Sequence, residues 1–316
     1  MKALTFCLLF AFSPFYALAA ESVQAITWLE RLSQSFKQLN FASSFVVVKN
    51  NQAEPYHWAH GVSEDGVQLE VLSLLNGPRR DTLRRDDIVS YIEPQLPPYS
   101  VKSNQISGPI PQILSGDIDQ LAENYDFISV GRSRVLGRSA QIIRIVAKDK
   151  TRYGHWLWLD QETGLLLKLA IVSDKGQLLE QIQFTHLDIT EKPSGYLTQL
   201  VETEFPKVVE MPNNNDLDVL NWQVNYLPKG FTAIKANRHR LALTKQPAEF
   251  MLFNDGLIDL SVYVSKSEDQ QRAVSYVKDG ATLILNQVVD GFEVSVVGKL
   301  PVKTAQNIAD SVAFKP

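Results

Sequence analysis

The sequence predicts a mainly β protein of the α+β class, built from a large N-terminal domain and a small C-terminal domain. Between Phe41 and Asp188, apolar and polar side chains alternate in short runs, and turn residues separate the runs. Apolar density falls between Lys192 and Asp218, where prolines and an asparagine run indicate a linker. Strand-like alternation resumes after this interval, so a second unit follows it.

The first residues resemble an export signal. Lys2 supplies a positive charge, Leu4 to Tyr16 is largely apolar, and Ala17–Ala19 has the small-x-small pattern of a signal-peptidase site. The apolar run is shorter than the ~20 residues that a membrane-spanning helix needs. Residues 1–19 are therefore predicted to be a signal peptide, and the mature chain is expected to be exported to the periplasm and soluble. The single cysteine, Cys7, would be lost with this peptide, so no disulfide is expected.

A helix is predicted to open the mature chain. Its apolar residues recur at the spacing that forms one stripe along a helix, and Ser22 is a candidate N-cap. The residues of this stripe are Ala25, Leu29, Leu32, Phe36 and Leu39. The pattern then changes to strands, which are expected at 45–48, 56–58, 67–75, around Leu83, and at 88–92.

The clearest hairpins lie between Arg152 and Asp188. The turns Asp160–Gly164 and Ser173–Gly176 each end in glycine, which adopts the positive φ that short hairpin loops require. Sequential strands joined by such turns form an antiparallel meander. A parallel sheet with alternating helices is not expected here.

We place the N-terminal domain at residues 20–205, the linker at 206–220 and the C-terminal domain at 221–316. In the last of these, Phe250–Val264 reads as a hairpin around Asn254–Gly256. A second hairpin is expected at 283–297, around Asp290 and Gly291. A helix is predicted after Pro301, with an apolar face formed by Val302, Ala305, Ile308, Ala309 and Val312.

Composition and motifs argue against an enzyme. The net charge of −4 and the 21% of charged residues are not those of a nucleic-acid-binding protein, which needs a strongly basic face. The chain contains no Gly-x-Ser-x-Gly, His-Glu-x-x-His, P-loop or dinucleotide-binding pattern. No catalytic, metal-binding or cofactor-binding residues are therefore assigned.

Two groups of residues are candidate binding sites, and each has a plainer explanation. The arginines Arg79, Arg80, Arg84 and Arg85 either form a charged sheet edge that discourages aggregation or contact an acidic partner or lipid phosphates. Trp156 and Trp158 lie on one face of a strand, with Leu157 and Leu159 on the other. Apolar residues on both faces indicate either core packing or a hydrophobic cleft for an acyl chain.

The order of several sequence blocks resembles the RseB/MucB family of periplasmic regulators of the sigma-E envelope-stress response. The resemblance is strongest from Gly77 to Asp188 and extends into the C-terminal domain. The blocks are Gly77–Arg80, Tyr91–Pro94, Tyr125–Arg132, Ile143–Asp149, Leu157–Lys168, Trp222, Leu227–Phe231 and Asn254–Gly256. The family implies an N-terminal domain shaped as an unclosed antiparallel β-barrel, similar to lipoprotein carriers such as LolA, and a small C-terminal domain.

The resemblance also implies a function as a negative regulator. Family members bind the periplasmic domain of the anti-sigma factor RseA and shield it from cleavage by the protease DegS, and lipid or lipopolysaccharide releases them. A carrier of lipids or lipoproteins that uses the same cleft is the alternative. A second copy of the chain is a further candidate partner.

Overall fold

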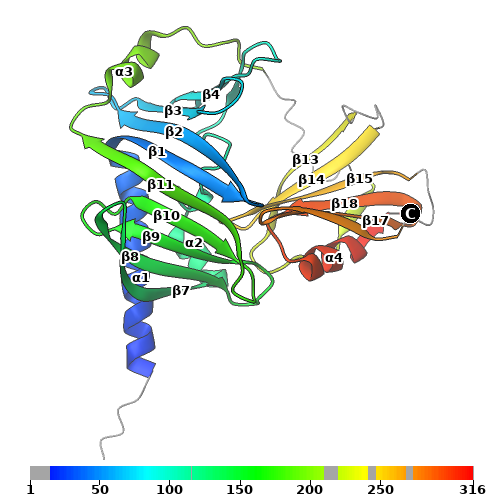
Figure 1. Cartoon of the computed structure of the whole chain (residues 1–316). Helices are drawn as coiled ribbons and strands as arrows, with labels where there is room; N and C mark the ends of the chain where they lie inside the picture. Colours follow the sequence, from blue (N-terminus) through cyan, green and yellow to red (C-terminus); the bar gives the residue numbers. More distant parts are fainter. Residues whose placement is uncertain (1–14, 115, 210–219, 241–246, 268–272, 316) are drawn as a thin grey trace, which may run out of the picture.

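In the computed structural model, a large curved sheet wraps around a helix. A smaller sheet lies against one end of the large sheet (Figure 1). The structure describes residues 15–114, 116–209, 220–240, 247–267 and 273–315. The larger sheet has 11 strands, all paired antiparallel with their neighbours. The predicted class, mainly β with an unclosed antiparallel sheet, is therefore confirmed.

The larger sheet consists of two meanders joined in the middle. Strands β1 to β6 follow one another in space, as do β7 to β11, and the pairing of β1 with β11 joins the two series. Because β6 and β7 are the two edges and do not pair with each other, the barrel is not closed. The strands are β1 (Asn40–Lys49), β2 (Gln52–Val62), β3 (Gln68–Leu74), β4 (Arg80–Arg85), β5 (Ile88–Ile92), β6 (Tyr99–Lys102), β7 (Tyr125–Val135), β8 (Arg138–Ala147), β9 (Gly154–Asp160), β10 (Leu166–Val172) and β11 (Leu178–Thr190).

Helix α1 (Phe15–Gln38) lies inside the curve of this sheet (Figure 1). Ala25, Leu29 and Leu32 of the predicted stripe are fully buried against apolar residues of the sheet. The helix begins before Ser22, so the prediction that Ser22 caps it is wrong. Residues 1–14 of the predicted signal peptide lie outside the described part of the chain.

The predicted hairpin turn at Gly164 also holds α1 in place. Gly164 has φ +82°, and a Cβ there would lie 2.8 Å from the Cγ of Arg31 on α1. Arg31 donates a hydrogen bond to the carbonyl of Gln161 in the same turn (3.1 Å). Glycine is therefore required here for both its backbone conformation and its small size.

Three short helices complete the N-terminal half. The loop after β6 leads through η1 (Gln112–Leu114) into α2 (Ile118–Asn124), where Asp117 caps the helix by accepting from the Gln120 amide. Helix α3 (Gly195–Glu202) covers the outer face of β2 to β4 with Leu197 and Leu200. Residues 206–209 then run beside the edge strand β6, with Val208 opposite Ser100. Residues 210–219, most of the predicted linker, lie outside the described residues.

The C-terminal half is a 6-stranded antiparallel sheet with one helix against it. Its strands, in spatial order, are β13 (Thr232–Arg240), β14 (Pro247–Asn254), β15 (Asp259–Lys266), β18 (Phe292–Gly298), β17 (Thr282–Val289) and β16 (Ser275–Asp279). Both predicted hairpins are present, as is the last helix, α4 (Val302–Asp310). Val312, which was expected on that helix, instead belongs to β19 (Val312–Phe314), which pairs with β12 (Trp222–Val224).

No helix among the described residues combines the length and the apolar content that crossing a bilayer requires.

Candidate functional site

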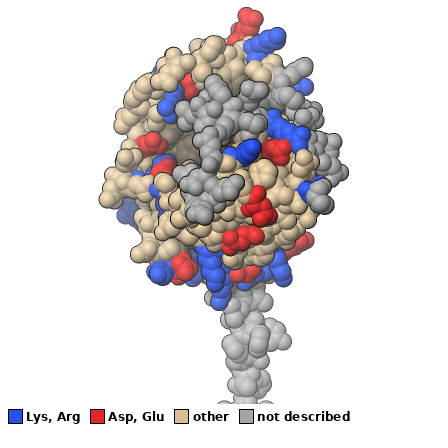
Figure 2. All heavy atoms as spheres, turned by 90° about the vertical axis from the view of Figure 1, so that its right-hand side faces the viewer, with Lys and Arg blue, Asp and Glu red and all other residues tan. Residues whose placement is uncertain are grey.

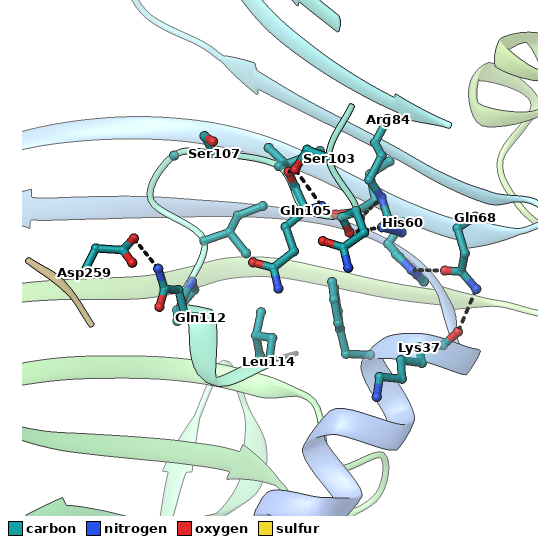
Figure 3. A pocket seen from close by; sticks show the side chains of 17 residues that line it. Lys37, His60, Gln68, Arg84, Ser103, Gln105, Ser107, Gln112, Leu114 and Asp259 are labelled. Carbon is teal, nitrogen blue, oxygen red and sulfur yellow. Dashed lines mark hydrogen bonds and ion pairs between the residues drawn. The ribbon is translucent and has the colours of Figure 1, made fainter. Parts of the chain in front are cut away.

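A polar pocket of about 680 Å³ opens inside the curved sheet, between β2–β4, the end of α1 and the loop 103–114 (Figure 3). We use the name polar pocket for the space lined by these segments and by Asp259. Its wall on the sheet consists of His60, Gln68, Glu70 and Arg84. Lys37 of α1 lies at the side, and amide side chains from the loop face the sheet across it.

The strand register explains why polar side chains collect at this place. Phe41 pairs with His60, His60 with Glu70, and Glu70 with Arg84. Residues directly opposite each other on neighbouring strands point to the same face of a sheet. One row across the concave face therefore changes from an aromatic residue on β1 to charged residues on β3 and β4.

Glu70 and Arg84 form a buried ion pair in this row. Arg84 Nε lies 2.6 Å from Glu70 Oε1, and both side chains are almost completely shielded from solvent. Trp58 Nε1 donates to Glu70 Oε2 (3.2 Å), and an Arg84 guanidinium nitrogen donates to the carbonyl of Asn104. Burial raises the pKa of the Glu70 carboxyl, and the charge of Arg84 opposes that rise. The pair therefore connects the sheet to the loop over the pocket.

His60 stays neutral beside this pair. Burial lowers the pKa of His60 to about 4, although its contacts with Leu39 and Gln68 favour the charged form. Its Nδ1 lies 2.9 Å from the Leu39 carbonyl oxygen and its Nε2 lies 3.2 Å from the Gln68 side-chain oxygen. A pocket with such a wall suits ligand groups that hydrogen-bond. An acyl chain would exclude water from this polar lining and could not replace its hydrogen bonds, which is unfavourable.

A second space, the interdomain cavity, lies between the two sheets and has a volume of about 310 Å³. Its floor is the concave face of β9–β11, with Leu157, Leu169 and Ile182, and the opposite wall includes Val297 of the smaller sheet. Its remaining walls are formed by loop residues 108–113 and by polar side chains. The polar residues are His155, Glu180, Asp259, Ser261, Thr282 and Lys299. This cavity is apolar on its floor and charged at its margin.

Arg152 joins the two halves of the protein next to that cavity. Its Nε lies 2.6 Å from Asp255 Oδ2, and both side chains have no solvent exposure. The same carboxylate accepts from Tyr125 Oη (2.5 Å), and the guanidinium lies over the rings of Tyr125 and Phe231, 5.2 and 4.9 Å from their centroids. Asp149 pairs with Arg152 as well (3.0 Å). A buried charge with this many partners fixes these segments of the two halves to each other.

The four predicted arginines do not form one exposed cluster. Arg84 is buried in the polar pocket, so the expectation of a charged, solvent-facing edge is wrong for this residue. Arg85, next in sequence, points to the opposite face of β4. There it donates to the carbonyls of Leu200, Val201 and Thr203 at the end of α3. Both are held by contacts within the chain, which their dense sequence spacing did not reveal.

Arg79 and Arg80 remain at the surface. Arg79 is 74% exposed and its Nε lies 2.5 Å from Asp81 Oδ2, while Arg80 is exposed at the start of β4. These two are accessible to an acidic segment or a phosphate. Contact with such a partner stays a prediction.

Trp156 and Trp158 lie on the convex face of the sheet, away from both spaces. Their rings stack with centroids 6.3 Å apart, and each is covered by a cation, Arg144 over Trp156 and Lys168 over Trp158. Leu157, between them, points the other way and lines the interdomain cavity. The two cavities described above lie on the other face of the sheet and therefore do not contact the indoles. A lipid cleft beside the indoles stays a prediction.

Sequence reasoning missed His60, Glu70 and Arg152. A signal for Glu70 existed, because Gln68 and Glu70 alternate with apolar residues in β3 and so share one face. Without the register between hairpins, however, nothing indicated that Arg84 would lie opposite Glu70. For Arg152 there was no local signal, because its partner Asp255 lies in the other half of the chain.

The described surface offers no concentrated charge of one sign on the side shown in Figure 2, where Lys and Arg are interspersed with Asp and Glu. Among the described residues, no group of three His, Cys, Asp or Glu side chains could hold a metal ion.

Comparison with known proteins relates both halves of the chain to one protein family. A family model described as the MucB/RseB N-terminal domain matches residues 24–209, and the MucB/RseB C-terminal domain matches residues 216–313. The chain is 31% identical to the sigma-E factor regulatory protein RseB of Salmonella typhimurium, over all of this chain and 99% of that protein. It is also 31% identical to the sigma factor AlgU regulatory protein MucB of Pseudomonas aeruginosa, over 93% and 92% of the two chains.

Solved structures of MucB are similar to this chain as well. A complex of Pseudomonas aeruginosa MucA and MucB contains a chain that is 30% identical and superposes with a TM-score of 0.75, over 93% of this chain and 99% of that one. A crystal structure of MucB, 29% identical over the same shares, gives 0.62. The order of the strands, the two halves and the matched sequences therefore place this chain in the MucB/RseB family.

Proposed function

We propose that this protein is a negative regulator of a sigma-E-type response, which acts by binding the periplasmic part of a membrane-anchored anti-sigma factor of the RseA or MucA type. The observation that carries the proposal is the similarity to RseB and MucB over nearly the whole chain, including a MucB structure solved with MucA.

In this proposal the protein works in the periplasm after removal of residues 1–19, as two domains connected through residues 206–220. Binding covers the site at which a DegS-type protease makes its first cut in the anti-sigma factor. Lipid or lipopolysaccharide releases the protein, and cleavage then proceeds. No step requires catalysis by this chain, which agrees with the absence of catalytic motifs from its sequence.

The test uses three purified components: the chain from residue 20, the periplasmic domain of the cognate anti-sigma factor, and a DegS-type protease in its active state. Cleavage of the anti-sigma domain is expected to slow as this protein is added and to stop near saturation. Cleavage of an unrelated substrate by the same protease should stay constant, which separates shielding from direct inhibition. Equal cleavage of the anti-sigma domain with and without saturating protein would overturn the proposal.

The lipid arm of the proposal can be tested in the same assay. Adding lipopolysaccharide is expected to restore cleavage, and the apolar floor of the interdomain cavity is a candidate place for an acyl chain. A lipid carrier, the alternative function, would bind the same lipid without protecting the anti-sigma domain. Protection without any effect of lipid would retain the regulator and remove lipid as its release signal.

A further inference from the structure

The smaller sheet touches the N-terminal half through two turns of different character. The anchor turn is residues 254–259, between β14 and β15. The clasp turn is Asp279 and Gly280, between β16 and β17. The interdomain cavity lies between them, since Asp259 near one turn and Thr282 near the other both line it.

The anchor turn is inserted into the N-terminal half. Asp255 pairs with Arg152 and accepts from Tyr125, with neither charge exposed. The Gln112 amide group donates to Asp259 Oδ2 (2.5 Å) and accepts from Asn254 Nδ2 (3.0 Å). Separating this turn would take the buried Asp255 carboxylate away from the cation of Arg152 and from the Tyr125 hydroxyl, which is strongly unfavourable.

The clasp turn rests on the tip of the β1–β2 hairpin, and its ion pair is accessible to water. Lys49 Nζ lies 2.6 Å from Asp279 Oδ2, and these side chains are 29% and 58% exposed. Asn50 Nδ2 donates to Asp279 Oδ1 (2.8 Å), and the Gly280 amide donates to Asn50 Oδ1 (3.2 Å). Exposed pairs of this kind contribute little and are weakened by salt.

One more pair lies between the two turns. Lys299 Nζ is 2.7 Å from Glu180 Oε1, and Glu180 is directly opposite Lys49 in the register of β1 and β11. Both Glu180 and Lys299 line the cavity. At this place the apolar floor of the N-terminal half and Val297 of the smaller sheet line opposite sides of the cavity, so they do not pack directly against each other.

We propose that the junction is an asymmetric hinge, in which the anchor turn stays seated while the clasp turn separates from the β1–β2 hairpin and opens the interdomain cavity. The unequal contacts carry this inference: the clasp pair is already partly exposed to water, whereas the anchor pair is completely buried. The clasp thereby controls access to the apolar floor formed by Leu157, Leu169 and Ile182. The hinge does not depend on which partner or ligand the protein binds.

A disulfide across the clasp tests the hinge directly. A Cβ built on Gly280 lies 2.9 Å from the Cβ of Lys49, and a disulfide joins Cβ atoms about 3.5–4.5 Å apart, so a small adjustment suffices. The chain from residue 20 contains no other cysteine. Lys49→Cys/Gly280→Cys is compared oxidised and reduced, with Gly280→Cys alone as the control for strain, because this residue has φ +62°. Circular dichroism verifies that each variant is folded.

The readout is the uptake of an apolar fluorescent probe, 8-anilinonaphthalene-1-sulfonate, by the folded protein. Oxidation is expected to remove most of the uptake that the reduced double variant shows, and reduction with dithiothreitol should restore it. Equal uptake in the oxidised and reduced states would overturn the proposal. So would failure of the two cysteines to form a disulfide in a folded protein, because the clasp contact would then not exist in solution.

Charge reversal provides a second test that does not involve Gly280. Lys49→Glu should raise the open fraction by about fivefold, the factor that corresponds to ~1 kcal/mol, and Lys49→Glu/Asp279→Lys should reverse most of that rise. The open fraction is measured from distances between spin labels at Lys175→Cys and Lys278→Cys, both exposed in the native chain. Lys192→Glu, which breaks an exposed pair with Glu64 within the N-terminal half, is the matched control and should change nothing. An unchanged distance distribution in Lys49→Glu would overturn the hinge.

Discussion

Two buried arginines in this protein make the same kind of ion pair but stabilise different parts of the structure. Arg84 pairs with Glu70 inside the larger sheet, and Arg152 pairs with Asp255 across the junction. The first pair follows from the register of adjacent hairpins, so it forms whenever that part of the sheet forms. The second forms only when the two halves meet. Similar chemistry therefore supports a pocket wall in one place and joins segments of the two halves in the other.

The two carboxylates also differ in how they would respond to the loss of their arginine, which affects the free energy of unfolding. Glu70 can take up a proton when its partner is removed, because its pKa is already raised by burial. Asp255 accepts from Tyr125 and from the backbone amides of Leu257 and Ile258, so it is held by several donors. The comparison predicts that replacing Arg152 lowers the free energy of unfolding more than replacing Arg84 does.

The largest effect is expected for Arg152→Gln. Loss of the guanidinium leaves Asp255 buried without a cation, which costs about 3–5 kcal/mol. Because the pair joins the halves, denaturant unfolding should change from one coupled transition to two. Arg80→Gln, an identical replacement at an exposed position, is the control and should leave unfolding unchanged. A single unshifted transition in Arg152→Gln would show that the junction is not held by this pair.

Arg84→Gln is expected to cost less, about 2–3 kcal/mol, since protonation of Glu70 relieves part of the buried charge. Unfolding should remain a single coupled transition, because the junction is untouched. Urea unfolding at pH 7 measures the loss. The replacement Glu70→Gln/Arg84→Met removes both charges and should recover much of the stability. If it is as unstable as Arg84→Gln alone, the ion pair is not the cause.

Each pair has a buried histidine near it, and both histidines should make stability fall in acid. Burial lowers the pKa of His60 and of His155 to about 4, against the ordinary value of 6.5. As pH falls below 6.5, the unfolded chain binds protons that the folded chain does not, so stability is lost between pH 6.5 and about 4. At pH 5 each histidine accounts for about 2 kcal/mol.

The measurement is the free energy of unfolding at pH 7 and pH 5 for wild type, His60→Gln and His155→Gln. Each variant should lose less stability than wild type over this interval. His155→Gln should additionally alter the domain junction, because His155 lines the interdomain cavity. A variant with the same pH dependence as wild type would mean that its histidine titrates normally in the folded state.

The smallest effects are expected at the tryptophans. Trp156→Phe and Trp158→Phe keep an aromatic ring on the convex face and weaken contacts with Arg144 and Lys168, a loss of under ~1 kcal/mol each. Since both indoles point away from the two cavities, their fluorescence should not respond when lipopolysaccharide binds. An emission shift that disappears in one of the two variants would place the lipid beside that indole, as the sequence predicted.

Much of the architecture was predictable from local patterns. The apolar stripe of α1, the glycine turns of the β9–β11 meander and the two C-terminal hairpins depend on residues close in sequence, and all are present. The start of α1 and the place of Val312 were not predicted correctly, because element ends depend on neighbours in space. Ser22 lies inside a longer helix, and Val312 pairs with Val224 on a strand.

The sequence by itself determined the strand periodicity, the turns and the absence of catalytic motifs, and it predicted an export signal at the N-terminus. Tertiary structure alone decided which of four neighbouring arginines are buried, which face of β9 meets a cavity, and that Arg152 meets Asp255. The physical reason is that a side chain's solvation and partners depend on strand register and on the docking of distant segments. Adjacent residues such as Arg84 and Arg85, alike in sequence, therefore point to opposite faces and hold different parts of the protein together.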